Sequence, residues 1–211
     1  MEIKRPLETA QFIDHTLLKA DATAADVDKL CAEAVRFGFK TVCVNPVHVK
    51  LAAWLLKREE PGVCSVVGFP TGATLTECKV RETEAVIKLG ATEVDMVMSV
   101  GCLKASDHKA VLKDLKAVVA AAGGVPVKVI IESGLLSDSE IVRACELCME
   151  AGAAFVKTCT GFGTGSASTS AVRLMRNTVG NALGVKASGG IKNFNDARAM
   201  LEAGANRLGT S

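Results

Sequence analysis

The sequence predicts an α/β fold, a (β/α)8 TIM barrel, in which residues 1–211 form a single domain. Short runs of β-branched residues alternate with helical patterns in units of about 25–30 residues, as in parallel strands joined by helices. Runs such as VKVII and CSVV are almost wholly apolar, which indicates strands covered on both faces. Residues that could take part in catalysis stand at the ends of several predicted strands, which favours a barrel over an open sheet. The GxGxxG turn of a dinucleotide-binding sheet is absent after the first strand.

A barrel of this kind needs eight strands, and seven are clear from the sequence. The eighth is expected near the N-terminus, where FIDHTLL contains the polar cluster Asp14, His15 and Thr16. The sequence stops directly after the last strand, at Ser211, so we expect a barrel that lacks its final helix. The seven clear strands are predicted at residues 41–44, 63–67, 94–98, 127–131, 154–158, 185–187 and 206–209.

Capping residues mark the helices between these strands. Thr23 is followed by Asp26, and Ser137 by Glu140, at the spacing of a capping box. Trp54 is expected to pack a helix against the core. The marked helices are predicted to begin at Thr23, Thr76, Ser137 and Asn193.

The composition is that of an ordinary soluble protein, with 49% hydrophobic and 23% charged residues. A net charge of +2 is too small to indicate a nucleic acid or an anionic membrane as partner. Neither a secretory signal nor an apolar membrane span is apparent. The eight cysteines lie mostly in apolar runs, so we expect reduced thiols in a cytoplasmic enzyme. Cys145 and Cys148 have no second ligand pair, so no metal site is predicted.

Two lysines stand at the carboxyl ends of predicted buried strands, Lys157 in AAFVKTCTG and Lys186 in GVKASGG. Burial disfavours an ammonium group, so lysines in such places suggest chemistry. A second ammonium about 5 Å away repels the first by about 3 kcal/mol at an effective dielectric near 20, which corresponds to about two pKa units downward. One amine of such a pair becomes a good nucleophile for a Schiff base. Electrostatics alone leaves open which of the two it is.

A carboxylate is predicted beside these amines. Asp95 lies within the strand EVDMVM, where a charged side chain is rarely a packing residue. It is either a structural partner for a buried lysine or an acid–base group. Lys128 and Glu132 share a parity in VKVIIES and are interpreted as a pair that lines the barrel, with a structural or a functional role.

Three glycine-rich segments are interpreted as anion-binding turns. Backbone N–H groups and helix N-termini at such turns favour a phosphate group, and the turns after the last strands are the usual phosphate site in barrels. The three segments are residues 160–165, 188–190 and 209–211.

Several motifs, in order along the chain, resemble the 2-deoxyribose-5-phosphate aldolase family of class I aldolases. They are DHTLLKADAT, VCVNP, GFPTGA, EVDMVM, KVIIESGLL, FVKTCTGFGTG, GVKASGGIK and ANRLGTS. The resemblance runs from about residue 12 to the last residue. It implies a (β/α)8 fold and reversible cleavage of 2-deoxy-D-ribose 5-phosphate to D-glyceraldehyde 3-phosphate and acetaldehyde through a lysine Schiff base, with the sugar's C3–C4 bond expected to break.

The resemblance also implies roles for individual residues. Lys157 matches the lysine that forms the Schiff base, Lys186 the lysine that perturbs its pKa, and Asp95 the aspartate that handles protons. Implied phosphate contacts are Gly161, Gly189, Gly190, Gly209 and Ser211. Implied pocket-lining residues are Asp14, Thr16, Cys43 and Thr160.

The expected partners are therefore a sugar phosphate and aldehydes, without cofactor, metal, nucleic acid or membrane. Homo-oligomer formation is left open. Three alternatives remain: a class I aldolase of other specificity, such as a transaldolase-like or sugar-bisphosphate enzyme; a catalytically silent phosphate-binding barrel; and a pyridoxal-phosphate enzyme, in which the second buried lysine lacks a purpose.

Overall fold

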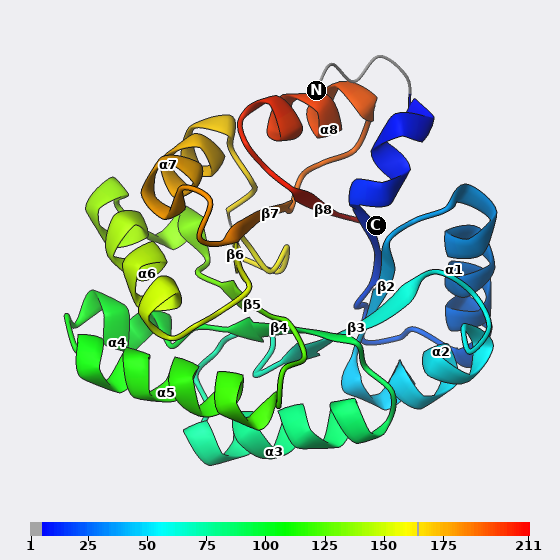
Figure 1. Ribbon diagram of the computed structural model, residues 1–211, viewed down its shortest axis with the longest axis horizontal. Coiled ribbons are helices and arrows are strands. Elements are labelled where there is room, and N and C mark those ends of the chain that lie inside the picture. The colour runs from blue at the N-terminus through cyan, green and yellow to red at the C-terminus, as the bar shows by residue number, and fades with distance from the viewer. Residues whose placement is uncertain (1–5, 164) are drawn as a thin grey trace.

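The strands form a closed parallel barrel in a computed structural model that describes residues 6–163 and 165–211. Each strand pairs with the next along the chain, and β8 closes on β1 with Asp14 opposite Gly209. Figure 1 shows the strands at the centre and the helices around them. The predicted (β/α)8 fold is confirmed, including the N-terminal strand. The strands are β1 Ile13–Leu17, β2 Thr41–Val44, β3 Gly62–Val67, β4 Glu93–Val97, β5 Val127–Ile130, β6 Phe155–Lys157, β7 Gly184–Ser188 and β8 Arg207–Thr210.

Helices connect every strand to the next, and the β4–β5 connection contains two of them. Within the described residues the barrel closes without an α-helix after β8. The α-helices are α1 Ala24–Phe37, α2 Val49–Leu55, α3 Thr76–Lys88, α4 Val100–Lys104, α5 His108–Ala121, α6 Asp138–Glu150, α7 Thr169–Val179 and α8 Phe194–Glu202. Three 3-10 helices accompany them, η1 Pro6–Phe12, η2 Pro46–His48 and η3 Ser133–Leu135.

The predicted capping boxes are present. At the start of α1, the Thr23 hydroxyl accepts from the backbone N–H of Asp26, whose carboxylate accepts from that of Thr23 at 2.8 Å. Ser137 and Glu140 make the same exchange at α6. The interpretation of Trp54 is wrong: its side chain is 71% exposed, because the short helix α2 turns its opposite face to the core.

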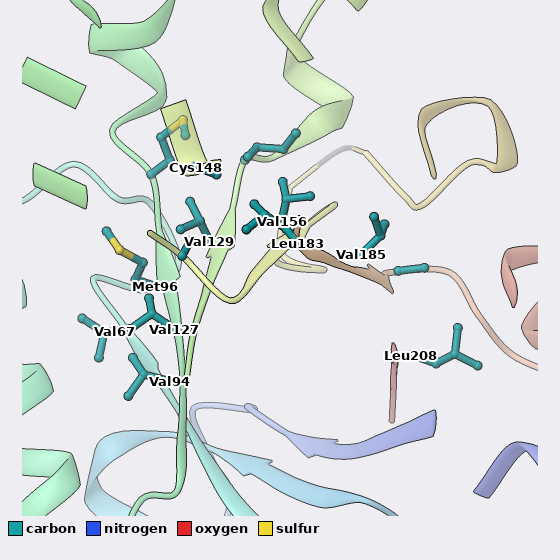
Figure 2. Packing of buried hydrophobic residues seen from close by; sticks show 14 of the residues in the cluster. Val67, Val94, Met96, Val127, Val129, Cys148, Val156, Leu183, Val185 and Leu208 are labelled. Carbon is teal, nitrogen blue, oxygen red and sulfur yellow. The ribbon is translucent and has the colours of Figure 1, made fainter. Parts of the chain in front are cut away.

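The hydrophobic core is the layer between the barrel and its helices. Valines and other apolar residues on alternate strand positions face outward and pack against the helices. Figure 2 shows part of this layer, in which Val94 and Met96 of β4 and Val129 of β5 appear with Cys148 of α6. Within the part of the chain described here, no helix is long and apolar enough to cross a bilayer.

One ion pair lies within the helical layer. The fully buried Lys79 of α3 donates to Asp114 of α5 at 2.6 Å and to the carbonyl of Val97, at the end of β4, at 3.0 Å. Asp114 also accepts from the Thr76 hydroxyl at 2.8 Å. The pair therefore ties two helices to the end of the strand that carries Asp95.

We predict that Lys79→Met alone destabilises the protein by about 3–5 kcal/mol, because it leaves the buried Asp114 carboxylate without its cation. The double variant Lys79→Met/Asp114→Leu should recover most of that loss, since no charge then remains buried. Chemical denaturation of both variants measures the difference. A single variant within about 1 kcal/mol of the parent, the value of an exposed pair, would contradict the prediction.

Candidate active site

Four neighbouring strands bring one carboxylate and three amines into the barrel interior. Asp95 of β4 is in register with Lys128 of β5, and Lys157 of β6 is in register with Lys186 of β7. In the parallel barrel, these positions all face the same enclosed space. The sequence predicted Asp95, Lys157 and Lys186 as a group, and the structure brings them together.

Asp95 is the centre of this cluster. Its Oδ2 accepts hydrogen bonds from Lys157 Nζ at 2.7 Å and Lys186 Nζ at 2.8 Å, and its Oδ1 accepts from Lys128 Nζ at 2.8 Å. Complete burial disfavours the carboxylate, but the three ammonium groups outweigh that penalty and hold the pKa of Asp95 well below its usual range. Because Lys157 and Lys186 bond the same oxygen, their nitrogens lie within the ~4–6 Å over which charges shift one another's ionisation.

Lys186 is fully buried and has a second carboxylate partner, Asp14 of β1. Burial lowers the pKa of Lys186, but Asp14 and Asp95 together raise it above the ordinary lysine value. Burial likewise opposes ionisation of Asp14, and the cations Lys186, Lys128 and Arg207 lower its pKa to about 2. Both groups therefore remain charged throughout the neutral range.

Glu93 and Arg207 form a part of the cluster that the sequence analysis did not single out. Lys128 lies 2.5 Å from Glu93, and Arg207 of β8 donates to Glu93 at 3.0 and 3.1 Å and to Asp14 at 2.6 Å. Burial opposes the charge of Lys128, but nearby carboxylates, Asp95 above all, raise its pKa well above the ordinary value. The signal in the sequence was parity, because Glu93 and Asp95 share one face of β4.

The interpretation of Lys128 and Glu132 as a pair is wrong. Lys128 bonds Asp95, whereas Glu132 accepts from the backbone and hydroxyl of Thr160. The reason is that β5 ends at Ile130, and Glu132 has the left-handed backbone angles φ 53° and ψ 58°. The alternation of a strand does not extend past its end.

A pocket of about 230 Å³ opens at the carboxyl ends of the strands, and Lys157 borders it. Lys128 and Lys186 are fully buried, so Lys157 is the lysine of this cluster that meets the pocket. The three glycine-rich segments predicted as anion-binding turns all contribute to its wall, although Thr164 lies outside the described residues. The predicted residues that border it are Thr16, Lys157, Thr160, Gly161, Gly189, Gly190, Gly209 and Ser211.

Two residues predicted to line the pocket, Asp14 and Cys43, do not border it. Asp14 is fully buried, forms an ion pair with Lys186, and accepts hydrogen bonds from Arg207 and from the Thr41 hydroxyl. Cys43 is also fully buried, opposite Cys64 on the neighbouring strand. A hydrogen bond with Cys64 lowers the pKa of the Cys43 thiol. Both side chains are therefore buried in the protein and are not part of the pocket wall.

The turn after β7 is built around two glycines. Gly189 and Gly190 have φ of 90° and 78°, a region that side chains with a Cβ rarely adopt. Gly209 is required by space, because a Cβ there would lie 2.8 Å from the Cβ of Ser188. The backbone therefore approaches the pocket directly, and Asn193 caps the start of α8 just beyond it. Such an arrangement suits an anion.

Among the residues that the structure describes, one group of side chains has donor atoms close enough together for a metal ion. Cys43, Cys64 and Asp95 offer sulfur and oxygen atoms within 4.8 Å of one another. The Asp95 oxygens already accept from three ammonium groups, and these would repel a metal cation. The cluster therefore favours amine chemistry over metal binding.

Comparisons with known proteins agree with this geometry. The DeoC/LacD family aldolase model matches residues 9–210. A deoxyribose-phosphate aldolase of Carboxydothermus hydrogenoformans is 59% identical over 206 residues, covering 96% of this chain and 90% of that one. One of Exiguobacterium sibiricum is 52% identical over 206 residues, covering 97% and 93%.

Solved structures are similar over the same length. A deoxyribose phosphate aldolase of Aeropyrum pernix, described as tetrameric, superimposes with a TM-score of 0.91 at 35% identity, covering 98% of this chain and 88% of that one. A second solved aldolase gives a TM-score of 0.93 at 36% identity, covering 96% and 91%. With an amine-bearing pocket in a closed barrel and matches along nearly its whole length, the chain belongs to the DeoC/LacD family of aldolases.

Proposed function

We propose that this protein is a deoxyribose-phosphate aldolase. It cleaves 2-deoxy-D-ribose 5-phosphate reversibly to D-glyceraldehyde 3-phosphate and acetaldehyde, through a Schiff base on Lys157. The observation that carries the proposal is a pocket-facing amine bonded to a buried carboxylate, with a second amine on the same carboxylate oxygen. The names of the relatives support the choice of substrate.

The charge balance of the cluster supports Lys157 as the nucleophile. The buried cluster contains more basic than acidic side chains. The carboxylates are Asp14, Glu93 and Asp95, and the basic groups are Lys128, Lys157, Lys186 and Arg207. The pKa values of Lys128 and Lys186 are raised, so these two amines keep their protons. Lys157 borders the pocket, so it is the amine of this cluster that a carbonyl substrate can reach. The neutral amine is the form that attacks a carbonyl.

The reaction follows from this arrangement. Lys157 Nζ attacks C1 of the open-chain sugar, and Asp95, 2.7 Å away, accepts and returns the protons that convert the adduct to an iminium ion with loss of water. The C2–C3 bond then breaks and its electrons move toward the iminium nitrogen, while the C3 hydroxyl gives its proton to Asp95, directly or through solvent. D-glyceraldehyde 3-phosphate leaves. The remaining enamine is protonated at C2, and hydrolysis releases acetaldehyde and Lys157.

The bond that breaks is C2–C3, and the sequence-based expectation of C3–C4 cleavage is wrong. Acetaldehyde carries two carbons, C1 and C2, and the three-carbon product carries C3 to C5. Cleavage next to C2 also places the developing charge one bond from the iminium carbon, where the nitrogen can accept it.

The far end of the substrate carries a phosphate, for which the glycine turns provide binding groups. Gly189 and Gly190 present backbone from one strand end, and Gly209 and Ser211 from the next. Backbone N–H groups and the nearby N-terminus of α8 attract an anion.

Eight cysteines without disulfides fit a reducing cytoplasm.

The first test is chemical trapping. Acetaldehyde and borohydride should attach an ethyl group to Lys157, because the imine formed there is reduced to a stable amine. Mass spectrometry of the digested protein locates the modification, and Lys157→Met should abolish it. Modification of Lys186 in the parent protein, or of no lysine in the barrel, would contradict the assignment.

The second test concerns the neighbouring charge. Lys186→Met should lower kcat by about 10²–10⁴-fold, the usual contribution of a group that assists proton transfer. Trapping at Lys157 should then also be slower, because the amine that bonds Asp95, the proposed proton carrier, is gone. The control Lys104→Met removes the same charge at the surface, where Lys104 pairs with Glu140. A variant that traps acetaldehyde at the parent's rate would show that Lys186 has no such effect.

A substrate panel separates the proposed function from its rivals. We expect acetaldehyde to be the preferred donor, whereas a transaldolase-like or sugar-bisphosphate aldolase would prefer a ketose-derived donor. Binding of 2-deoxyribose 5-phosphate without turnover would support the catalytically silent barrel instead. Absorbance of an internal pyridoxal imine in the purified protein would support the pyridoxal-phosphate alternative.

We also infer that the chain forms a homo-oligomer, as the tetrameric relative from Aeropyrum pernix does. Val47 of η2 is 80% exposed and Trp54 of α2 is 71% exposed, and aromatic residues such as tryptophan are enriched in protein interfaces. Sedimentation velocity should give the mass of two or more chains, and Trp54→Ser should increase the monomer fraction. A monomeric parent protein, or an unchanged mass in the variant, would contradict this inference.

A further inference from the structure

Glu132 has a strained backbone at the rim of the barrel. It follows β5 directly and has φ 53° and ψ 58°, the left-handed region that residues with a Cβ rarely occupy. Strain of this kind persists where the surrounding structure requires it, and it is concentrated at functional sites. The proposed reaction uses no atom of Glu132, so its conformation calls for another explanation.

The Glu132 carboxylate holds the turn that follows β6. Its Oε2 accepts from the Thr160 hydroxyl at 2.6 Å and from the Thr160 backbone N–H at 3.1 Å. The Thr160 hydroxyl oxygen in turn accepts from the backbone N–H of Phe162 at 3.1 Å. One buried carboxylate oxygen thus fixes the start of the turn and, through Thr160, the orientation of the next peptide groups.

This turn forms one wall of the active-site pocket. Thr160, Gly161 and Phe162 all border the pocket with Lys157, whereas Glu132 does not. Glu132 instead borders a second cavity of about 250 Å³ on the other side of the turn, to which Thr160 and Phe162 also contribute. The negative charge of Glu132 is therefore separated from the pocket by the turn that it holds.

The other oxygen of the carboxylate is free. Among the described residues, Glu132 Oε1 is buried without a hydrogen-bond partner, and a Cβ at Gly163 would come within 3.6 Å of it. A buried carboxylate oxygen without a partner is costly. Its retention next to the strained backbone indicates that Glu132 is held in place for its bonds to Thr160.

We propose that Glu132 is a positioning residue that sets the 160–162 turn for recognition of the substrate's phosphate. The inference rests on the proposed function and deepens it, because it assigns the discrimination between phosphorylated and unphosphorylated sugars partly to a residue outside the pocket. Gly161, on this turn, has φ 84° and so depends on the turn's conformation to direct its N–H group. A displacement of about 1 Å at such a contact can change a rate by about 100-fold.

The test compares 2-deoxyribose 5-phosphate with 2-deoxyribose. Glu132→Ala should raise KM for the phosphorylated sugar by about 10- to 100-fold, with a much smaller change in kcat/KM for the unphosphorylated one. Glu132→Gln keeps an oxygen that accepts from Thr160 and should restore most of the preference. Glu140→Ala is the matched control. It removes a glutamate whose carboxylate also accepts a backbone hydrogen bond, in the capping box of α6, but which borders neither cavity. It should leave the preference for the phosphorylated sugar unchanged.

A double-mutant cycle tests whether Glu132 acts through Thr160. Thr160→Val removes the same hydroxyl bond from the other side, so its effect and that of Glu132→Ala should not add. Additive effects, or equal losses for both sugars, would overturn the proposal and leave Glu132 as a general structural support. If Glu132→Ala does not fold, the comparison of Thr160→Val with the parent still measures the loss of preference.

Borohydride trapping keeps this result separate from the proposed function. Acetaldehyde carries no phosphate, so Glu132→Ala should trap acetaldehyde on Lys157 as the parent does. Loss of trapping in the variant would overturn the positioning role, because the damage would then extend to the amine. Absence of trapping, or of any preference for the phosphorylated sugar, in the parent protein would overturn the proposed function and this inference with it.

Discussion

The interior of this barrel depends on the carboxylate of Asp95. Three ammonium groups converge on its two oxygens, and all four side chains are buried. Without the carboxylate, the loss of hydration would favour neutral amines or unfolding, because an uncompensated buried charge is costly. The same group that permits the lysines to be buried also lies within bonding distance of the proposed nucleophile, so packing and chemistry use one side chain.

Burial and access distinguish two lysines that are otherwise equivalent. Lys157 and Lys186 occupy paired positions on neighbouring strands and donate to the same oxygen. Lys186 has the additional partner Asp14 and is sealed from the pocket, which keeps its charge. Lys157 is the one that borders the pocket. The division into a permanent cation and a proposed nucleophile thus follows from the second carboxylate on β1, which also ties β1 to Arg207 of β8 where the barrel closes.

The rim of the barrel contains backbone conformations that are locally unfavourable but that shape the pocket. Positive φ angles at Gly189 and Gly190, a close approach at Gly209 and a strained Glu132 all lie at the carboxyl ends of the strands. Departures from regular structure at a barrel's catalytic face are expected, because the strands below supply the rigid support. The ion pair between Lys79 and Asp114 provides such support in the helical layer, at the carboxyl end of β4. The packed strands and this ion pair therefore hold the irregular turns in place.

Much of the fold could be read from local sequence, because its determinants are local. Apolar runs and capping residues such as Thr23 and Ser137 fix where strands and helices begin and end. Asp95, Lys157 and Lys186 could be identified because a charged side chain inside a buried strand is unfavourable unless it has a partner or a function. The glycine turns were found in the same way, by the backbone freedom that only glycine has.

Tertiary structure decided depth and partnership. Parity along a strand says which way a side chain points, but its height within a closed barrel depends on register with neighbours far away in sequence. Asp14 and Arg207 meet only because β1 and β8 close the sheet, and the buried Asp14 does not border the pocket. Lys128 forms its hydrogen bond with Asp95 and not with Glu132, because β5 ends before Glu132 and the backbone turns there. Long-range register and the ends of strands are set by the packing of the whole barrel, which no single segment encodes.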